Sequence, residues 1–189
     1  MFGLAGWNGT IVTKDFFLKY ATNDIRRKQF LVGEQPGGFN YTLEVASLDN
    51  PGAAPQAGVR NVKFYPAGVQ SGGGASNDFP IYRYADVILM MAECNARLGN
   101  PGAAKPFIDQ IRVRAGLNAL DHNPTLDDIY NERGFELNWE GHRRQDMIRF
   151  DKFLLANEFR AASPAFRKLF PIPTSALDAN RGLKQNPGY

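Results

Sequence analysis

The chain has 189 residues, enough for one domain with its own core or for a large part of a bigger one. Its 22 basic and 19 acidic residues leave a net charge of +3, and they are interspersed, unlike the one-signed stripe of a nucleic-acid-binding surface. No run approaches the roughly 18 apolar residues of a membrane span, and the single cysteine, Cys94, excludes an internal disulfide and a cysteine-based zinc site.

Residues 1–80 form the loop-rich part of the chain. The pattern predicts a short helix over 14–20 and a polar turn or second short helix over 24–29, and alternation predicts strands at 41–45 and 59–65. Residues 49–55 and the glycine-rich residues 70–77 are predicted loops. No Gly-Lys-Ser/Thr follows the glycines, so they do not form a phosphate-binding loop.

Residues 81–162 have helical periodicity. The apolar face predicted for the first helix consists of Tyr84, Val87, Ile88, Met91, Ala92 and Leu98, and that for the second of Ala104, Phe107, Ile108, Ile111 and Ala115. Residues 99–102 stop the first helix, and Gly116 is placed to cap the second. A connection this short predicts an antiparallel pair, within which we expect Cys94 to be a small buried residue.

A third helix is predicted to begin after Thr125, an N-cap with Asp128 three residues further on. Its apolar side carries Leu126, Ile129, Tyr130 and Leu137. Residues 140–142 should break or bend it, a fourth helical run follows from 143 toward 155, and prolines favour an extended chain from Ser163 onward. We therefore expect one domain with three parts: a loop-rich segment at 1–80, a helical core at 81–162, and an extended tail at 163–189 that packs on the core.

Glu132, Glu136 and Glu140 repeat at four-residue spacing, which would place them on one helix face. One interpretation is an acid/base pair of a carbohydrate-active enzyme that uses Glu136 or Glu140. The interpretation we favour is a charged face neutralised by Arg133, Arg143 or Arg144, because carboxylates one turn apart lie side by side instead of facing each other across a substrate.

Metal and nucleophile patterns are missing. His122, in a loop beside Asp121, and His142, expected in a polar network at the helix bend, are the only histidines and form no His-Glu-x-x-His motif. No Gly-x-Ser-x-Gly occurs. We predict no catalytic residue, no cofactor and no metal site, although oxygen ligands in a loop leave calcium open.

Aromatic residues in the early loops are the stronger signal. Trp7 and Asn8 stand on one predicted turn, and Phe39 and Tyr41 flank an asparagine after two glycines. Sugar rings stack their C–H faces on flat aromatics while amides bond the hydroxyls, so Trp7, Asn8, Phe39 and Tyr41 are candidate ligand-binding residues. The alternative is that the aromatics fill the core of a loop-rich region.

Several segments together resemble the carboxy-terminal region of the SusD/RagB family, nutrient-binding lipoproteins of the outer membrane of Bacteroidota. The resemblance covers most of the chain and rests on residues 24–27, 77–87, 92–93, 111–117, 132–137, 140–143, 170–173 and Asn180, with a closing run of Gln185, Asn186, Pro187, Gly188 and Tyr189. It implies a mainly α, SusD-like fold with a tetratricopeptide-like helical hairpin at 81–115, long irregular loops and a few short strands.

The resemblance also implies a role. Family members are not enzymes: they capture glycans or other nutrients at the cell surface and pass them to a SusC-like TonB-dependent transporter, the expected protein partner. The expected location is the outer membrane, through a lipid anchor that this chain does not contain. An alternative function is a helical-repeat module that binds a protein and has no glycan site of its own.

Two departures from the family pattern are visible. The signal peptide, lipidated cysteine and long N-terminal helical region are not seen, so we expect a fragment or truncated product. Where many members carry an aromatic pair after His-Arg, this chain has Arg144-Gln145, which alters packing or surface detail and no functional residue.

Overall fold

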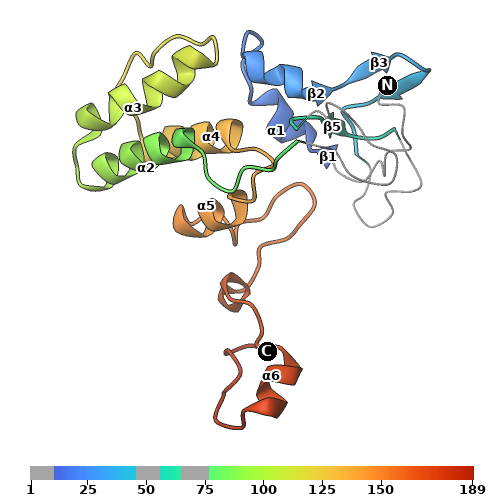
Figure 1. The fold of residues 1–189 in the computed structure, drawn as a ribbon, viewed down its shortest axis with the longest axis vertical. Coiled ribbons are helices and arrows are strands. Elements are labelled where there is room, and N and C mark those ends of the chain that lie inside the picture. The colour runs from blue at the N-terminus through green and yellow to red at the C-terminus, as the bar shows by residue number, and fades with distance from the viewer. Residues whose placement is uncertain (1–10, 46–55, 65–76) are drawn as a thin grey trace. The chain divides into compact units, whose positions relative to one another are not determined.

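The computed structural model describes residues 11–45, 56–64 and 77–189 (Figure 1). Helices predominate, which confirms the mainly α class, and the strands are two or three residues long. The chain divides into two units, residues 1–142 and residues 143–189. Among the described helices, none is both long and apolar enough to span a bilayer.

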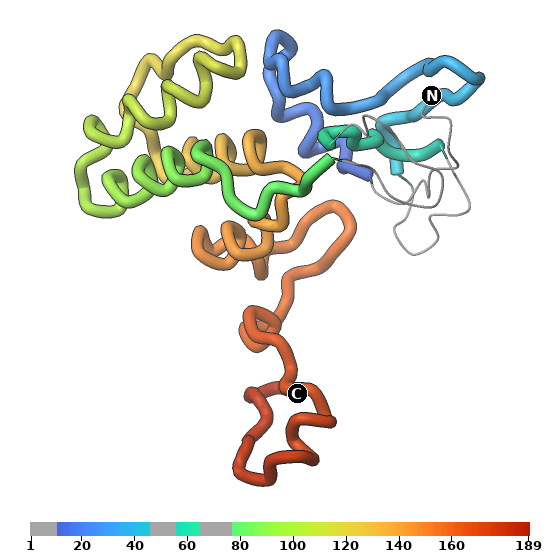
Figure 2. The backbone as a smooth tube through the Cα atoms, viewed as in Figure 1, coloured from blue at the N-terminus to red at the C-terminus, as the bar shows by residue number. Residues whose placement is uncertain are grey.

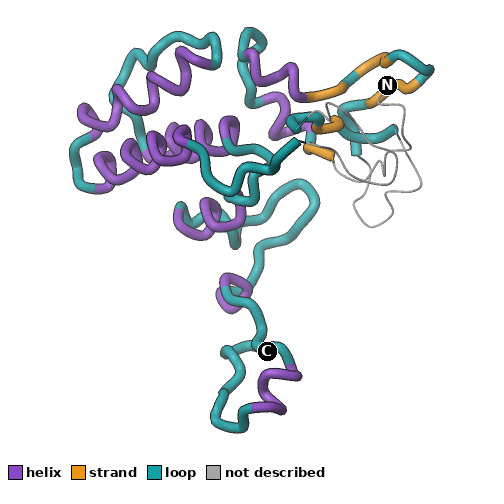
Figure 3. The backbone as a smooth tube through the Cα atoms, viewed as in Figure 1, coloured by secondary structure: helices purple, strands orange, loops and turns teal. Residues whose placement is uncertain are grey.

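The described N-terminal residues form two small sheets, whose strands are orange in Figure 3. β1 (Ile11–Val12), β5 (Val59–Asn61) and β2 (Phe30–Leu31) form one antiparallel sheet in that order. β3 (Gly33–Gln35) and β4 (Phe39–Tyr41) form a hairpin. The helix α1 (Lys14–Leu18) and the 3₁₀ helix η1 (Ile25–Gln29) match two predicted segments. The strand predicted at 41–45 is misplaced, since it shares only Tyr41 with β4, and the strand predicted at 59–65 ends at Asn61. The buried core residues here are Val12, Phe17, Tyr20, Phe30 and Val59.

α2 (Tyr84–Arg97) and α3 (Pro101–Arg114) form the predicted helical hairpin (Figure 2). Each helix ends in the same way, with a glycine in the left-handed region at Gly99 (φ +79°) and Gly116 (φ +78°). The next amide in each case, that of Asn100 or Leu117, bonds back to the carbonyl five residues earlier. Glycine tolerates this conformation without steric cost, and the motif satisfies the last helix carbonyls.

The apolar face predicted for α2 is partly wrong. Ile88 and Ala92 are buried as expected, together with Ala85 and Leu89, but four of the predicted residues are exposed: Tyr84, Val87, Met91 and Leu98. Cys94 is exposed as well, which corrects the expectation of a buried thiol. α2 has apolar side chains around most of its circumference, so spacing alone does not identify the face that packs on α3 and α4.

α4 (Leu126–Glu136) begins at the predicted cap. The Thr125 side chain accepts from the Asp128 amide, and the Asp128 carboxylate accepts from the Thr125 amide, a complete capping box. Ile129 and Leu137 are buried as predicted, whereas Leu126 is exposed. The helix ends earlier than expected, so Glu140 lies in the following turn and does not share a helix face with Glu132.

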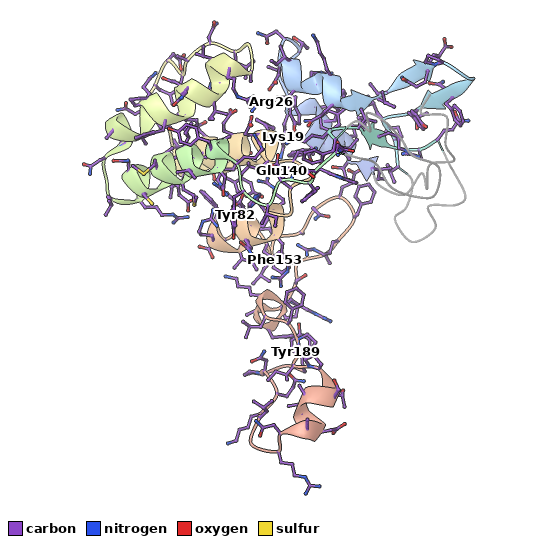
Figure 4. The ribbon with its side chains drawn as sticks, viewed as in Figure 1. Lys19, Arg26, Tyr82, Glu140, Phe153 and Tyr189 are labelled. Atoms are coloured by element: carbon purple, nitrogen blue, oxygen red, sulfur yellow. The ribbon has the colours of Figure 1, made fainter. Side chains whose placement is uncertain are left out.

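The second unit holds α5 (Arg143–Arg149), the 3₁₀ helix η3 (Ala165–Lys168) and α6 (Thr174–Ala179). The predicted fourth helical run is therefore shorter than expected, and the predicted extended tail contains two short helical segments. The closing run is bonded to the proline-rich segment before it. Gln185 donates to the Ile172 carbonyl and accepts from its amide, and Asn186 donates to the Phe170 carbonyl. The Tyr189 hydroxyl, labelled in Figure 4, donates to the Leu169 carbonyl at 2.9 Å.

Candidate functional site

Buried charges hold the first unit together. We use "ionic cluster" for its nine linked side chains, which are Asp24, Arg26, Lys63, Arg83, Arg112, Arg114, Glu132, Glu136 and Glu140. They come from η1, the segment after β5, the residues before α2, the end of α3, and α4 with its following turn. Figure 4 labels Arg26 and Glu140, which lie between the helical hairpin and the strands in that view.

Arg26 links the two sides of this cluster. Its guanidinium bonds Asp24 at 2.7 Å, Glu132 at 2.7 Å and Glu136 at 3.3 Å. Arg83 bonds Glu136 at 2.9 Å and Glu140 at 2.7 Å. Each buried carboxylate thus has at least one cationic partner, the condition under which charge is tolerated inside a protein.

Two cations of the cluster also cap α4. Lys63 donates to the carbonyls of Glu136 and Asn138, and Arg83 donates to the Glu136 carbonyl at 2.9 Å. The last carbonyls of a helix lack partners within it and carry partial negative charge, so cations stabilise them. These contacts give a reason for the early end of the helix.

Burial and pairing act on the pKa values of the cluster in opposite directions. Burial disfavours the ionised form of Glu140, but the hydrogen bonds from Arg83 and Lys63 outweigh it and hold the Glu140 pKa below its usual value. For Glu132 burial prevails over the attraction of Arg26, and its pKa is raised.

The carboxylates are neutralised by cations, as the favoured interpretation expects, but they are buried, do not form one helix face, and have other partners than those expected. Glu132, Glu136 and Glu140 are neutralised by members of the ionic cluster, whereas Arg133 pairs with Asp86 at 2.9 Å. Arg143 and Arg144 belong to the second unit. Within that unit the Arg144 guanidinium lies over the rings of Phe153 and Phe170, at 4.9 and 4.1 Å from their centroids.

The two described candidate ligand-binding residues lie on β4. The rings of Phe39 and Tyr41 are nearly parallel, with centroids 6.2 Å apart and an interplanar angle of 16°. Phe39 is 46% exposed, whereas Tyr41 is 7% exposed. Asn40, between them, has an exposed side chain. Successive side chains of a strand point to opposite faces, so Asn40 reaches solvent on the other face from Phe39, whose ring is supported by that of Tyr41.

β5 and the residues just before it hold this hairpin in place. The Arg60 guanidinium lies 4.8 Å from the centroid of the Tyr41 ring and donates to the carbonyls of Ala57 and Gly58. The Gln56 side-chain oxygen accepts from the backbone amide of Asn40 at 2.6 Å. Because polar contacts and a cation–π interaction hold Tyr41 in place, the Phe39 ring has a fixed support.

Trp7 and Asn8, the other two candidates, lie outside the described residues, as do residues 46–55 and most of the glycine-rich connection. Arg60 and Gln56 are supporting residues that sequence reasoning missed. Alternation along 59–65 placed Arg60 on a strand but did not reveal which ring it covers.

In the described part of the chain, no group of three His, Cys, Asp or Glu side chains is arranged so that it could hold a metal ion. His122 lies between Asp121 and Asp128, with ring nitrogens 2.6 and 3.2 Å from their carboxylates. Hydrogen bonds to Asp121 and Asp128 raise the pKa of His122. The Nε2 atom of His142 is buried and finds no partner among the described residues, so the polar network expected for this side chain stays a prediction.

The sequence and the fold are similar to those of known proteins. The family model described as "SusD family" matches residues 7–167. SusD-like protein P25 of Formosa agariphila is 31% identical over 97% of this chain and 36% of its own length. The starch-binding protein SusD of Bacteroides thetaiotaomicron is 30% identical over 59% of this chain and 22% of its own length.

A solved structure agrees with this. A SusD superfamily protein from Parabacteroides distasonis superposes with a TM-score of 0.69 at 28% identity, covering 95% of this chain and 42% of that one. The matches define a SusD-like helical-hairpin protein. The chain belongs to the SusD family, and it spans between about a fifth and two fifths of the length of these relatives.

Proposed function

We propose that the protein captures glycans at the bacterial cell surface without cleaving them and delivers them to a SusC-like TonB-dependent transporter. The observation that carries the proposal is the β3–β4 hairpin, which presents the exposed Phe39 ring on the nearly parallel ring of Tyr41. A supported aromatic face that packs on sugar C–H groups suits a carbohydrate. A relative of this chain is named a starch-binding protein, which supports the same ligand class.

The ionic cluster supports a role without catalysis. A general acid needs a carboxyl that can be protonated near neutral pH and that reaches the substrate. Glu136 and Glu140 are buried and each bonds at least two cations, and those cations lower the pKa of Glu140. We expect no release of reducing ends from any glycan; turnover abolished by Glu140→Gln would revive the enzyme hypothesis.

Binding can be tested on a polysaccharide panel by affinity electrophoresis and calorimetry with the full chain. Phe39→Ala should weaken binding about two- to tenfold, since stacking on an aromatic contributes on the order of 0.5–1.5 kcal/mol. Tyr82→Ala is the matched control, because Tyr82 is 79% exposed and lies outside the hairpin. Unchanged affinity of the Phe39 variant would remove the hairpin from the site.

Trp7 and Asn8 remain candidate contacts. Trp7→Ala belongs in the same panel, and unchanged affinity would exclude Trp7. Loss of binding in both aromatic variants would favour a site that spans the two loops.

The exposed face of α2 favours a second candidate function, a helical-repeat module that binds a protein and no glycan. Tyr84, Val87, Met90, Met91 and Leu98 are all exposed there, and apolar side chains clustered on a surface commonly mark a protein contact. Co-purification of a transporter, with no glycan bound at millimolar concentration, would favour this function over glycan capture.

A further inference from the structure

A pocket of about 320 Å³ opens between the end of α1, α3 and α4, and the residues proposed to bind glycan on the β3–β4 hairpin are not part of it. Its lining consists of Lys19, Ile108, Arg112, Leu120, Asp128, Asn131, Glu132 and Phe135. The volume is at the low end of the roughly 300–1,000 Å³ typical of ligand pockets, which suits one small ring. Lys19 is labelled in Figure 4.

We propose that this pocket binds a single carboxylate-bearing sugar ring, such as a hexuronate. Its lining combines unused hydrogen-bond donors with apolar side chains, which are the two kinds of surface that such a ring presents.

The donors are the first part of the argument. Within the described part of the chain, neither the Lys19 ammonium nor the Asn131 side chain has a partner. Arg112 donates through Nε to the Asn118 carbonyl and through Nη1 to Glu132 at a long 3.4 Å, and its Nη2 takes part in neither bond. Two cations and an amide thus remain able to bond a ligand.

The carboxylates of the lining are already engaged. Glu132 accepts from Arg26 at 2.7 Å, and Asp128 accepts from the amide and hydroxyl of Thr125 in the capping box. The adjoining ionic cluster sets five cations against four carboxylates. The excess of positive charge beside the pocket favours an anion, and charge-assisted hydrogen bonds would hold it.

The apolar part of the lining supplies the other half of the recognition. Ile108, Leu120 and Phe135 come from three different segments and leave room for the C–H face of a ring. Phe135 is fixed from behind by Tyr20, whose ring centroid is 4.6 Å away. A bare inorganic anion would leave this apolar surface unused.

Calorimetry or ligand-observed NMR with the full chain tests the assignment, using D-glucuronate, D-glucose and acetate as probes. We expect glucuronate to bind measurably more tightly than either of the others, since glucose lacks the carboxylate and acetate lacks the ring. No glucuronate binding, or acetate binding of equal strength, would overturn the proposal.

Variants distinguish this pocket from other basic surfaces. Lys19→Met should weaken glucuronate binding about tenfold or more. Adding Asn131→Leu to the Lys19 variant should weaken binding further. Lys28→Met, at an exposed lysine of η1 outside the pocket, should leave it unchanged. Equal affinity in the Lys19 variant and the Lys28 control would refute the site.

The pocket and the hairpin can fail separately. Phe39→Ala should leave glucuronate binding intact, because Phe39 is not in the lining. Loss of glucuronate binding in the Phe39 variant would contradict a second, independent site.

Discussion

The ionic cluster and the β3–β4 hairpin use polar chemistry in contrasting ways. In the cluster, four carboxylates are almost completely buried and each is bonded to a guanidinium or ammonium group; for the three glutamates these groups come from distant segments. On the hairpin, the Phe39 ring faces solvent, and the Tyr41 ring that supports it is buried under the Arg60 guanidinium. Buried charge that is fully paired leaves little freedom for a ligand, whereas an exposed ring on a fixed support is free to bind one. The comparison assigns a mainly structural role to the ionic cluster, apart from Arg112 and Glu132 at the pocket, and recognition to the hairpin.

Removing a member of the cluster should give the largest effect on stability. Glu136→Ala leaves Arg83 and Arg26 without one of their buried partners, and breaking a buried pair costs about 3–5 kcal/mol. Glu34→Ala, at an exposed carboxylate of the hairpin, should change the free energy of unfolding by less than about 0.5 kcal/mol. Urea denaturation of both variants measures the difference, and equal midpoints would contradict the contrast between the regions.

Two glycines compare the packed segment before β5 with the open turn of the hairpin. Gly58 and Gly38 share a φ of +81°, but an added Cβ at Gly58 would lie 2.9 Å from Ile11 Cδ1 and 3.0 Å from Val45 Cγ2, whereas at Gly38 nothing lies within 4 Å. Gly38→Ala should therefore cost only the left-handed backbone term, about 1–2 kcal/mol. Gly58→Ala should cost about 1–3 kcal/mol more through overpacking. Thermal unfolding compares the two, and similar losses would show that the segment before β5 yields to the added methyl group.

The capping box of α4 should have a smaller effect. Thr125→Ala removes the side-chain acceptor of the Asp128 amide and should cost about 1 kcal/mol. Thr174→Ala, at the first residue of α6, makes a suitable control because Thr174 is not an N-cap. Chemical denaturation should separate the two, and an equal loss in the control would mean that the box adds nothing.

The smallest expected effect depends on pH. Asp121 and Asp128 raise the pKa of His122 in the folded protein above its unfolded value of about 6.5. The stability from these contacts is therefore fully present below that unfolded pKa and is lost as pH rises through the folded pKa. Denaturant midpoints at pH 5.5 and pH 8.5 should differ more for the wild type than for His122→Gln, and an identical pH dependence of the two would refute the contribution.

Local patterns predicted those parts of the fold that depend on neighbouring residues. The hairpin α2–α3, its glycine caps and the Thr125 box were all visible in the sequence, because each motif lies within a few residues. The buried face of α2 was not visible in the sequence, since the exposed residues Tyr84, Val87 and Met91 satisfy the same spacing as the residues that are buried. Periodicity detects an apolar stripe, but tertiary contacts decide which of two stripes is buried.

The candidate site was predictable only in part, for a related reason. Loop aromatics after glycines pointed to Phe39 and Tyr41, yet their opposite exposures depend on Arg60, which covers the inner ring from another strand. The partners of the glutamates were missed because Arg26 lies 106 residues before Glu132, a distance that no local pattern spans. Trp7 and Asn8 remain predictions.

The position of Arg26 along the chain also bears on the order of assembly. Its bonds to Glu132 and Glu136 close loops of 106 and 110 residues, whereas α2 and α3 meet across a connection of three residues. Closing the longer loop costs more entropy, so the helical hairpin should form early and the N-terminal segment should dock late. On the ribosome, Arg26 leaves the exit tunnel long before its acceptors are synthesised. The segment that carries Arg26 therefore stays undocked, with the guanidinium hydrated, until α4 has been synthesised and can bury it.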